Sequence, residues 1–250
     1  MSRAATFRAM LAAAYGTIGL VRQARLPLLC VAVAVLAGCG GGGGNGEAGK
    51  PPSQIVSDAQ AATKGATSVH VYGSGTTNGA PLKLDLYLVA GKGGRGHLTA
   101  NGLSFDLIRI GNHAYFRGDA GFWRRFGGGA AVALLKGRWL MAPADQGDFA
   151  AFAPLTNISK LFGAILGGHG TLAKGKTATV DGQSAIAVID RGRNGGTLFV
   201  ATKGKPYPLE VVSPGAKQGT IHFGSWNASV PLSAPANPID INKLKALAGG

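Results

Sequence analysis

The sequence predicts an α+β protein built around a curved antiparallel β-sheet with a helical insert halfway along it. The first indication is a series of short runs with apolar residues at every second position, separated by glycine-containing turns. The second is the composition: 42 of the 250 residues are glycine, 46% are apolar and only 14% are charged. This composition supports a core and excludes a disordered chain, a coiled coil, collagen and a disulfide-knotted small protein.

The first 38 residues have the features of a bacterial export signal. Two apolar runs, 10–21 and 26–38, follow basic residues, and each is shorter than the about 18–20 apolar residues that span a bilayer. The second run ends in Leu-Ala-Gly before Cys39, which resembles a lipobox, whose cysteine receives a diacylglyceryl group. We therefore expect cleavage after residue 38 and a lipid anchor on Cys39. If translation starts at Val21, residues 1–20 are not part of the protein.

The alternative is that Cys39 is an ordinary cysteine behind a cleaved signal. A lipidated Cys39 leaves 212 residues and removes four arginines, which lowers the formal net charge from +14 to +10. Cys30 is also removed, so no intramolecular disulfide can form. We expect residues 39–52, with the run Gly40–Gly44, to be a tether. The folded domain is predicted over 53–241 and a C-terminal tail over 242–250.

The first part of the domain predicts one helix and then a meander of strands. Ser53 is a candidate N-cap for a helix whose apolar stripe contains Ile55, Val56, Ala59 and Ala62. Strands are predicted at 69–72, 82–89, 95–100, 103–110 and 113–117. Asn101-Gly102 predicts a two-residue hairpin turn.

The middle of the chain departs from the strand pattern. Residues 119–140 mix aromatic residues with a glycine run and predict no single element. Residues 148–166 have helical apolar spacing, with Asp148 and Asn157 as candidate caps of two successive helices. Strands then return at 171–180, 184–191, 196–202, 209–213 and 220–230, with a turn at Asp181-Gly182. The count reaches nine or ten strands, and a sheet of that length curls.

Two glycine-rich patterns match nucleotide-binding motifs, but neither lies in the sequence context that such a motif requires. Gly170–Thr177 matches the P-loop pattern, but β-branched residues and a turn follow it where a helix is required. Gly91-x-Gly93-x-x-Gly96 lies between two predicted strands and predicts a turn. The five histidines have no metal-site spacing and the eleven acidic residues are spread singly, so we predict no catalytic residues, no metal and no cofactor. A Ser–His–Asp triad assembled from distant strands stays open as an alternative.

Several short segments resemble the LppX/LprG lipoproteins of actinobacterial envelopes and, more distantly, the LolA-type lipoprotein carriers. They include Ser68–His70, Leu84–Leu86, Val180–Gln183, Lys205–Glu210, Ile221–Phe223 and Trp226-Asn227, and they follow a candidate lipobox and a short helix. The resemblance implies a half-barrel of about nine to eleven strands with helices across its concave face. It also implies an apolar cavity for acyl chains and a non-enzymatic function.

From this resemblance we expect a monomeric carrier of a lipid or lipoglycan on the extracytoplasmic face of the cell membrane, with an envelope transporter as a possible partner and no nucleic acid. The basic body favours an anionic headgroup or membrane. The candidate cavity residues are Leu84, Leu86, Leu88, Ile108, Phe149, Phe152, Leu155, Leu161, Phe162 and Ile165. Two other functions remain as alternatives: an envelope sensor or assembly factor that binds protein, and a hydrolase.

Overall fold

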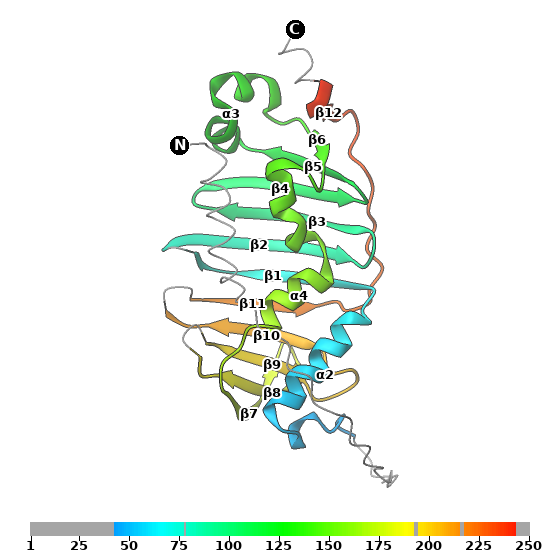
Figure 1. Cartoon of the computed structure of the whole chain (residues 1–250), viewed down its shortest axis with the longest axis vertical. Coiled ribbons are helices and arrows are strands. Elements are labelled where there is room, and N and C mark those ends of the chain that lie inside the picture. The colour runs from blue at the N-terminus through cyan, green and yellow to red at the C-terminus, as the bar shows by residue number, and fades with distance from the viewer. Residues whose placement is uncertain (1–42, 78, 193–194, 216–217, 244–250) are drawn as a thin grey trace, which may run out of the picture.

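A computed structural model describes residues 43–77, 79–192, 195–215 and 218–243. Its described part contains one twelve-stranded sheet in the order β12-β6-β5-β4-β3-β2-β1-β11-β10-β9-β8-β7 (Figure 1). The strands are β1 Ser68–Thr77, β2 Ala80–Val89, β3 Gly93–Ala100, β4 Leu103–Ile110, β5 His113–Gly118, β6 Leu140–Pro143, β7 Leu172–Val180, β8 Gln183–Asp190, β9 Thr197–Ala201, β10 Pro208–Ser213, β11 Gly219–Gly224 and β12 Ile239–Asp240. The predicted signal and Cys39 lie outside the described residues.

The two halves of the chain meet at β1, which pairs with β2 on one side and β11 on the other. Val71 is the partner of Leu86 in the first pair and of Phe223 in the second. All neighbouring strands are antiparallel except β12 and β6, which run parallel. The sheet ends at β7 and β12 and is not closed into a barrel, which confirms the predicted α+β half-barrel class. The strand count exceeds the prediction because β6 and β12 are short and carry no clear alternation.

The helices pack on the concave face of this sheet (Figure 1). They are η1 Glu47–Gly49, α2 Pro52–Lys64, α3 Ala120–Leu135, η2 Gly147–Thr156 and α4 Ile158–Leu166. α2, α4 and η2 follow the long axis of the sheet, and α3 packs near β4 and β5 at one end. The apolar side chains of helices and sheet form one large buried cluster, so the covered face is also the main core.

Local sequence signals account for several element boundaries. Asn101-Gly102 and Asp181-Gly182 both have positive φ angles, 53° and 74° in the first pair and 47° and 77° in the second, which confirms the predicted tight turns. The Oδ1 atom of Asn157 accepts a hydrogen bond of 2.9 Å from the amide of Lys160 and caps α4, as predicted.

Two cap predictions were wrong. α2 begins at Pro52 after Pro51, so Ser53 lies inside the first turn; proline suits that position because it lacks the amide hydrogen left unpaired there. η2 begins at Gly147 after Gln146, so Asp148 is not its cap.

The structure also contains a helix that the sequence pattern did not predict. α3 begins after Asp119, whose Oδ1 atom accepts a 2.6 Å hydrogen bond from the amide of Phe122. Gly128 has φ 72° and kinks the helix, which explains why the glycine run concealed its periodicity. The predicted strand at 220–230 ends at Gly224, because Ser225 and Asn227 turn the chain with φ angles of 48° and 63°.

Candidate functional site

The sheet side of the apolar layer contains three candidate residues from β2. Leu86 and Leu88 are fully buried in the large cluster, and Leu84 is partly buried against it. Gly96 lies beside Leu86 on β3, and a Cβ atom there would collide with the Asp85 carbonyl oxygen and the Leu86 side chain. The glycine therefore leaves room for Leu86 over the sheet.

The helix side of the layer contains most of the other candidates. Phe152, Leu155, Leu161 and Phe162 are buried in the same cluster, and Ile165 packs against it. The ring centroid of Phe152 lies 4.9 Å from that of Phe116. The backbone of Phe149 belongs to η2, but its side chain is outside what the structure describes.

Ile108 does not belong to this layer. The buried residues of β4 that join the large cluster are Phe105 and Leu107, and alternation along the strand places Ile108 on the opposite face. Phe105 and Leu107 therefore replace Ile108 among the candidates for ligand contact. The apolar run at Leu107-Ile108 did not by itself reveal which residue faces the helices.

The opposite, convex face carries polar pairs that the sequence did not predict. His70 Nε2 lies 2.8 Å from Asp85 Oδ1 on the neighbouring strand, and His222 Nδ1 lies 3.3 Å from both Asp181 Oδ2 and Glu210 Oε2. Glu210 and His222 are directly opposite in the register of β10 and β11, His70 and Asp85 lie diagonally across β1 and β2, and Asp181 reaches His222 from the turn between β7 and β8. Among the described residues, no three His, Cys, Asp or Glu side chains form a group that could hold a metal ion.

A Ser–His–Asp arrangement lies on the same convex face. Ser104 Oγ is 2.8 Å from His97 Nε2, and His97 Nδ1 is 2.8 Å from Asp106 Oδ1. All three residues come from the hairpin of β3 and β4, and Asp106 also pairs with Arg117 at 2.8 Å. His97 is about half exposed, at 52%. The distances suit proton transfer from a serine hydroxyl, but the side chains stand on an open sheet surface.

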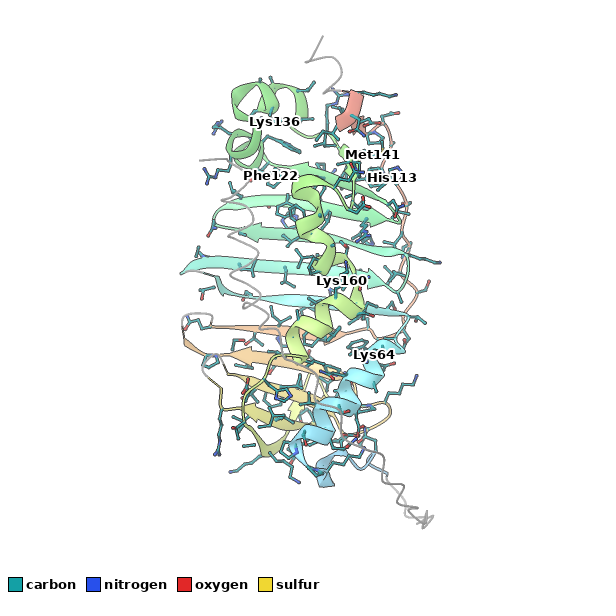
Figure 2. The ribbon with its side chains drawn as sticks, viewed as in Figure 1. Lys64, His113, Phe122, Lys136, Met141 and Lys160 are labelled. Carbon is teal, nitrogen blue, oxygen red and sulfur yellow. The ribbon has the colours of Figure 1, made fainter. Side chains whose placement is uncertain are left out.

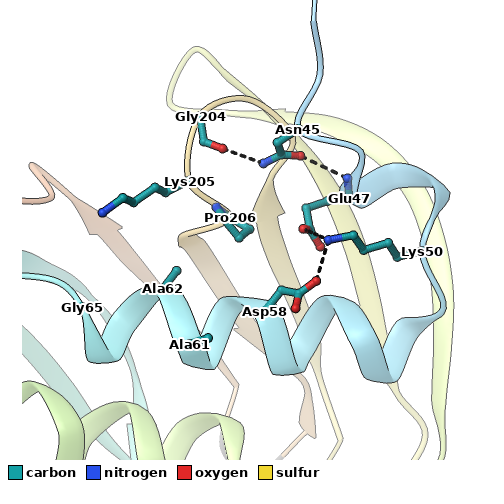
Figure 3. A pocket seen from close by; sticks show the side chains of 10 residues that line it. All are labelled: Asn45, Glu47, Lys50, Asp58, Ala61, Ala62, Gly65, Gly204, Lys205 and Pro206. Atoms are coloured by element: carbon teal, nitrogen blue, oxygen red, sulfur yellow. Dashed lines mark hydrogen bonds and ion pairs between the residues drawn. The ribbon is translucent and has the colours of Figure 1, made fainter. Parts of the chain in front are cut away.

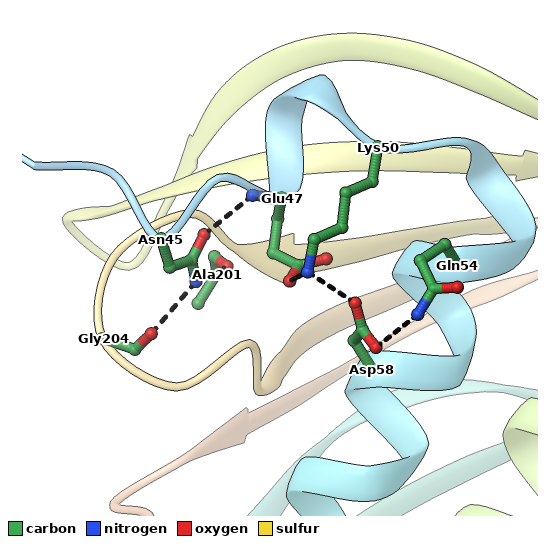
Figure 4. A network of polar contacts seen from close by, with 7 residues as sticks. All are labelled: Asn45, Glu47, Lys50, Gln54, Asp58, Ala201 and Gly204. Carbon is green, nitrogen blue, oxygen red and sulfur yellow. Dashed lines mark hydrogen bonds and ion pairs between the residues drawn. The ribbon is translucent and has the colours of Figure 1, made fainter. Parts of the chain in front are cut away.

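The segment predicted as tether is partly docked on the sheet. The backbone amide of Asn45 donates a 2.7 Å hydrogen bond to the Thr202 carbonyl, and its side chain donates to the carbonyls of Ala201 and Gly204 at 2.9 and 3.1 Å. Glu47 is buried, with 2% of its side chain exposed. The prediction of a tether over 39–52 was therefore wrong from Asn45 onward (Figure 4). We call residues 45–50 the strap.

A pocket of about 530 Å³ lies between the strap, α2 and the loop that joins β9 to β10 (Figure 3). Its walls include Ala61, Ala62 and Pro206, and Lys205 lies at its rim. The pocket is lined by both polar and apolar residues, and it contains none of the predicted cavity residues.

An ionic network stabilises the strap at this pocket. Lys50 Nζ lies 2.7 Å from Glu47 Oε1 and 2.6 Å from Asp58 Oδ2, and Gln54 donates to Asp58 Oδ1 at 2.7 Å (Figure 4). The hydrogen bond from Lys50 lowers the pKa of Asp58, and the hydrogen bonds to Asp58 and Glu47 raise the pKa of Lys50. The network ties the strap to α2.

The open twelve-stranded sheet with helices along its concave face is similar in fold to a solved structure of the LppX/LprG type. The crystal structure of LprF from Mycobacterium bovis superposes with a TM-score of 0.53 and 18% identity, covering 78% of this chain and 100% of that chain. This similarity confirms the resemblance at the level of fold.

Two further structures are similar at a lower level. Lipoprotein LppX from Mycobacterium tuberculosis gives a TM-score of 0.45 at 18% identity, covering 73% of this chain and 98% of that chain. The structure of the Pseudomonas aeruginosa MucA/MucB complex gives a TM-score of 0.40 at 16% identity. The match covers 74% of this chain and 61% of that chain. No protein-family model and no curated protein matches the sequence. In the described part of the chain, no helix is long and apolar enough to cross a membrane.

Proposed function

We propose that the chain is an exported, lipid-anchored lipoprotein that holds an acyl chain of a lipid or lipoglycan between the concave face of its sheet and the helices over it. The observation that carries this proposal is the helical cover itself. A single segment, η2 and α4, places Phe152, Leu155, Leu161 and Phe162 over the sheet. These residues and Leu84, Leu86, Leu88, Phe105, Leu107 and Ile165 are the proposed contacts of the acyl chain.

The contacts between the helical cover, η2 and α4, and the sheet suit a ligand that inserts between them. The contacts of the cover with the sheet are mostly apolar, and the polar contact described between them is weak, from Arg109 Nη1 to Thr156 Oγ1 at 3.5 Å. An acyl chain can replace apolar contacts with equivalent ones and leave the hydrogen bonds of the sheet intact. Each methylene buried in this way contributes about 0.8 kcal/mol. The helices would separate from the sheet as the chain enters.

The anchor in this proposal is a diacylglyceryl group on Cys39, six residues before the strap. It would hold the domain, residues 53–241, on the extracytoplasmic face of the cell membrane as a monomer, where a transporter could load or unload it. A diacylglyceryl group carries two acyl chains and so anchors more firmly than a single chain, and a basic body adds attraction to an anionic membrane. In this proposal the protein carries or presents its ligand and catalyses no reaction.

Mass spectrometry of the protein purified from the membrane tests both parts. Organic extraction is expected to release an acyl-bearing lipid, and the intact chain is expected to begin at Cys39 with a diacylglyceryl adduct. Cys39→Ser should abolish the adduct. A purified protein that releases no lipid and takes up no fluorescent fatty acid would contradict the carrier function.

The Ser104–His97–Asp106 arrangement supports a second candidate, a serine hydrolase. Its hydrogen-bond distances favour an activated serine, whereas its exposed position and the engagement of Asp106 by Arg117 argue against a shielded reaction site. A fluorophosphonate probe decides between the two functions. Labelling that is lost in both Ser104→Ala and His97→Ala would favour the hydrolase, and an unlabelled protein would argue against it.

A further inference from the structure

The second half of α3 presents an unusual surface. Beyond the kink at Gly128, only Leu135 is buried, while Ala130, Ala133 and Leu134 are exposed. Leu134 is 41% exposed and is one of two large apolar side chains described as exposed, the other being Ile189. The first half of the helix packs Phe122 and Trp123 into the core and holds the element in place. α3 therefore offers an apolar ridge to the outside while being fixed to the sheet.

Positively charged residues lie close to this ridge along the chain. Arg124, Arg125, Lys136 and Arg138 are all exposed, and the stretch 120–140 contains no acidic residue. We call the ridge and these four cations the α3 surface. A helix with an exposed apolar ridge flanked by Lys and Arg is typical of elements that lie in the interface of an anionic bilayer.

We propose that the α3 surface docks on the anionic bilayer that holds Cys39, with Leu134 at the level of the lipid headgroups. This proposal rests on the lipid anchor proposed above. The chain from Cys39 to Asn45 can span at most about 20 Å, because an extended chain advances roughly 3.3–3.6 Å per residue. The strap and α3 lie at opposite ends of the long axis of the sheet, with Lys136 labelled at the α3 end (Figures 1 and 2). The domain would therefore be held covalently by the lipid near the strap and dock on the bilayer through the α3 surface at the other end.

The chain supplies a matched control for the charges. Lys136-Gly137-Arg138 follows α3, and Lys203-Gly204-Lys205 lies in the loop between β9 and β10. All four of these basic residues are exposed, and both glycines have positive φ angles, 73° and 64°. Reversing the two charges in either tripeptide changes the net charge of the protein by the same amount. A difference in membrane docking between the two variants therefore depends on where the charges lie and not on the total charge.

The test uses the lipidated chain, verified by mass, reconstituted in vesicles of phosphatidylcholine with phosphatidylglycerol or of phosphatidylcholine alone. An environment-sensitive fluorophore is attached at Leu134→Cys, an exposed position. We expect its emission to shift to shorter wavelength on the anionic vesicles. The shift should be lost with Lys136→Glu/Arg138→Glu and retained with Lys203→Glu/Lys205→Glu, and circular dichroism checks that all variants are folded.

No shift on anionic vesicles, or equal loss in both charge-reversed variants, would overturn the proposal. A missing diacylglyceryl adduct would be seen in the mass beforehand, so failure of the anchor is distinguishable from failure of α3 docking. The fluorescence readout does not depend on acyl uptake. Failure of the carrier function is therefore also distinguishable from failure of α3 docking.

Discussion

The ring of Phe162 in α4 packs against the ring of Phe223 in β11, with centroids 4.9 Å apart and an interplanar angle of 55°. Both residues are 2% exposed. The contact joins the helical cover to a strand beside the centre of the sheet, where the two halves of the chain meet. It therefore fastens the cover at the middle of the concave face.

Replacing Phe162 should destabilise the protein strongly. Removal of a fully buried phenylalanine side chain typically costs about 3–5 kcal/mol, so Phe162→Ala should lower the free energy of unfolding in urea by that amount. Leu134→Ala, at an exposed position, should change it by less than about 1 kcal/mol. Similar losses in the two variants would show that α4 is not packed on the sheet as described.

Gly96 should not tolerate a side chain. A Cβ atom at this position meets the Asp85 carbonyl and the Leu86 side chain, and overpacking of this kind costs about 1–3 kcal/mol. Gly96→Ala should therefore lower the midpoint of thermal unfolding. Gly129→Ala is the control, because a Cβ atom there meets open space and alanine favours a helix. A neutral Gly96→Ala would contradict the close approach of Leu86 to β3.

The strap should loosen when Asn45 is replaced. Asn45→Ala removes the two hydrogen bonds from its side chain to Ala201 and Gly204 and the 3.1 Å bond that its Oδ1 atom accepts from the Glu47 amide. We expect faster hydrogen exchange at the amide of Lys50, which bonds to the Glu47 carbonyl. Gln146→Ala, whose side chain caps nothing, should leave that exchange unchanged. Unchanged protection in Asn45→Ala would show that the strap is held by other contacts.

The ionic network should add stability within a defined pH range. Because Lys50 lowers the pKa of Asp58 in the folded protein, this contribution is present above the ordinary carboxyl pKa of 3.8 and is lost as the pH falls through the lower folded value. The raised pKa of Lys50 acts at the other end of the pH scale. Its contribution to stability is present below the ordinary lysine pKa of 10.5 and is lost as the pH rises through the higher pKa of the folded protein.

Urea unfolding as a function of pH checks this network. Asp58→Asn should be less stable than the unmodified protein near neutral pH, by a modest amount because the pair is partly exposed, and the difference should shrink in strong acid. Asp145→Asn, at an exposed turn position, should show no such convergence. A difference that stays constant from acid to neutral pH would contradict the assigned pairing.

Local signals predicted the parts of the fold that depend on neighbouring residues. The turn at Asn101-Gly102 and the cap at Asn157 could be predicted because each satisfies backbone geometry within a few positions. α3 was missed because Gly128 interrupts its helical period. The pairing of β12 with β6 was missed because it joins residues 139–141 to 239–240, and nothing in either short segment indicates the other.

The candidate site was predicted less completely for a related reason. Apolar spacing identified Phe152, Leu161 and Phe162 because helical residues three or four apart share a face. It misplaced Ile108, because a run of adjacent apolar residues does not indicate which alternate position is buried. The Ser104–His97–Asp106 arrangement was missed because it depends on the register of β3 and β4. That register follows from the predicted two-residue turn at Asn101-Gly102, so the sequence contained a signal that could have aligned these residues.

The most direct test of the central claim is the identification of whatever lipid remains bound to the protein purified in its exported form. Native mass spectrometry should show a complex of the chain with an acyl-bearing lipid, and Leu161→Asn, which places a polar group in the apolar layer, should reduce its occupancy. The control is Leu134→Asn, which alters a leucine outside this layer. A lipid-free protein that also fails to take up a fluorescent fatty acid would contradict the account.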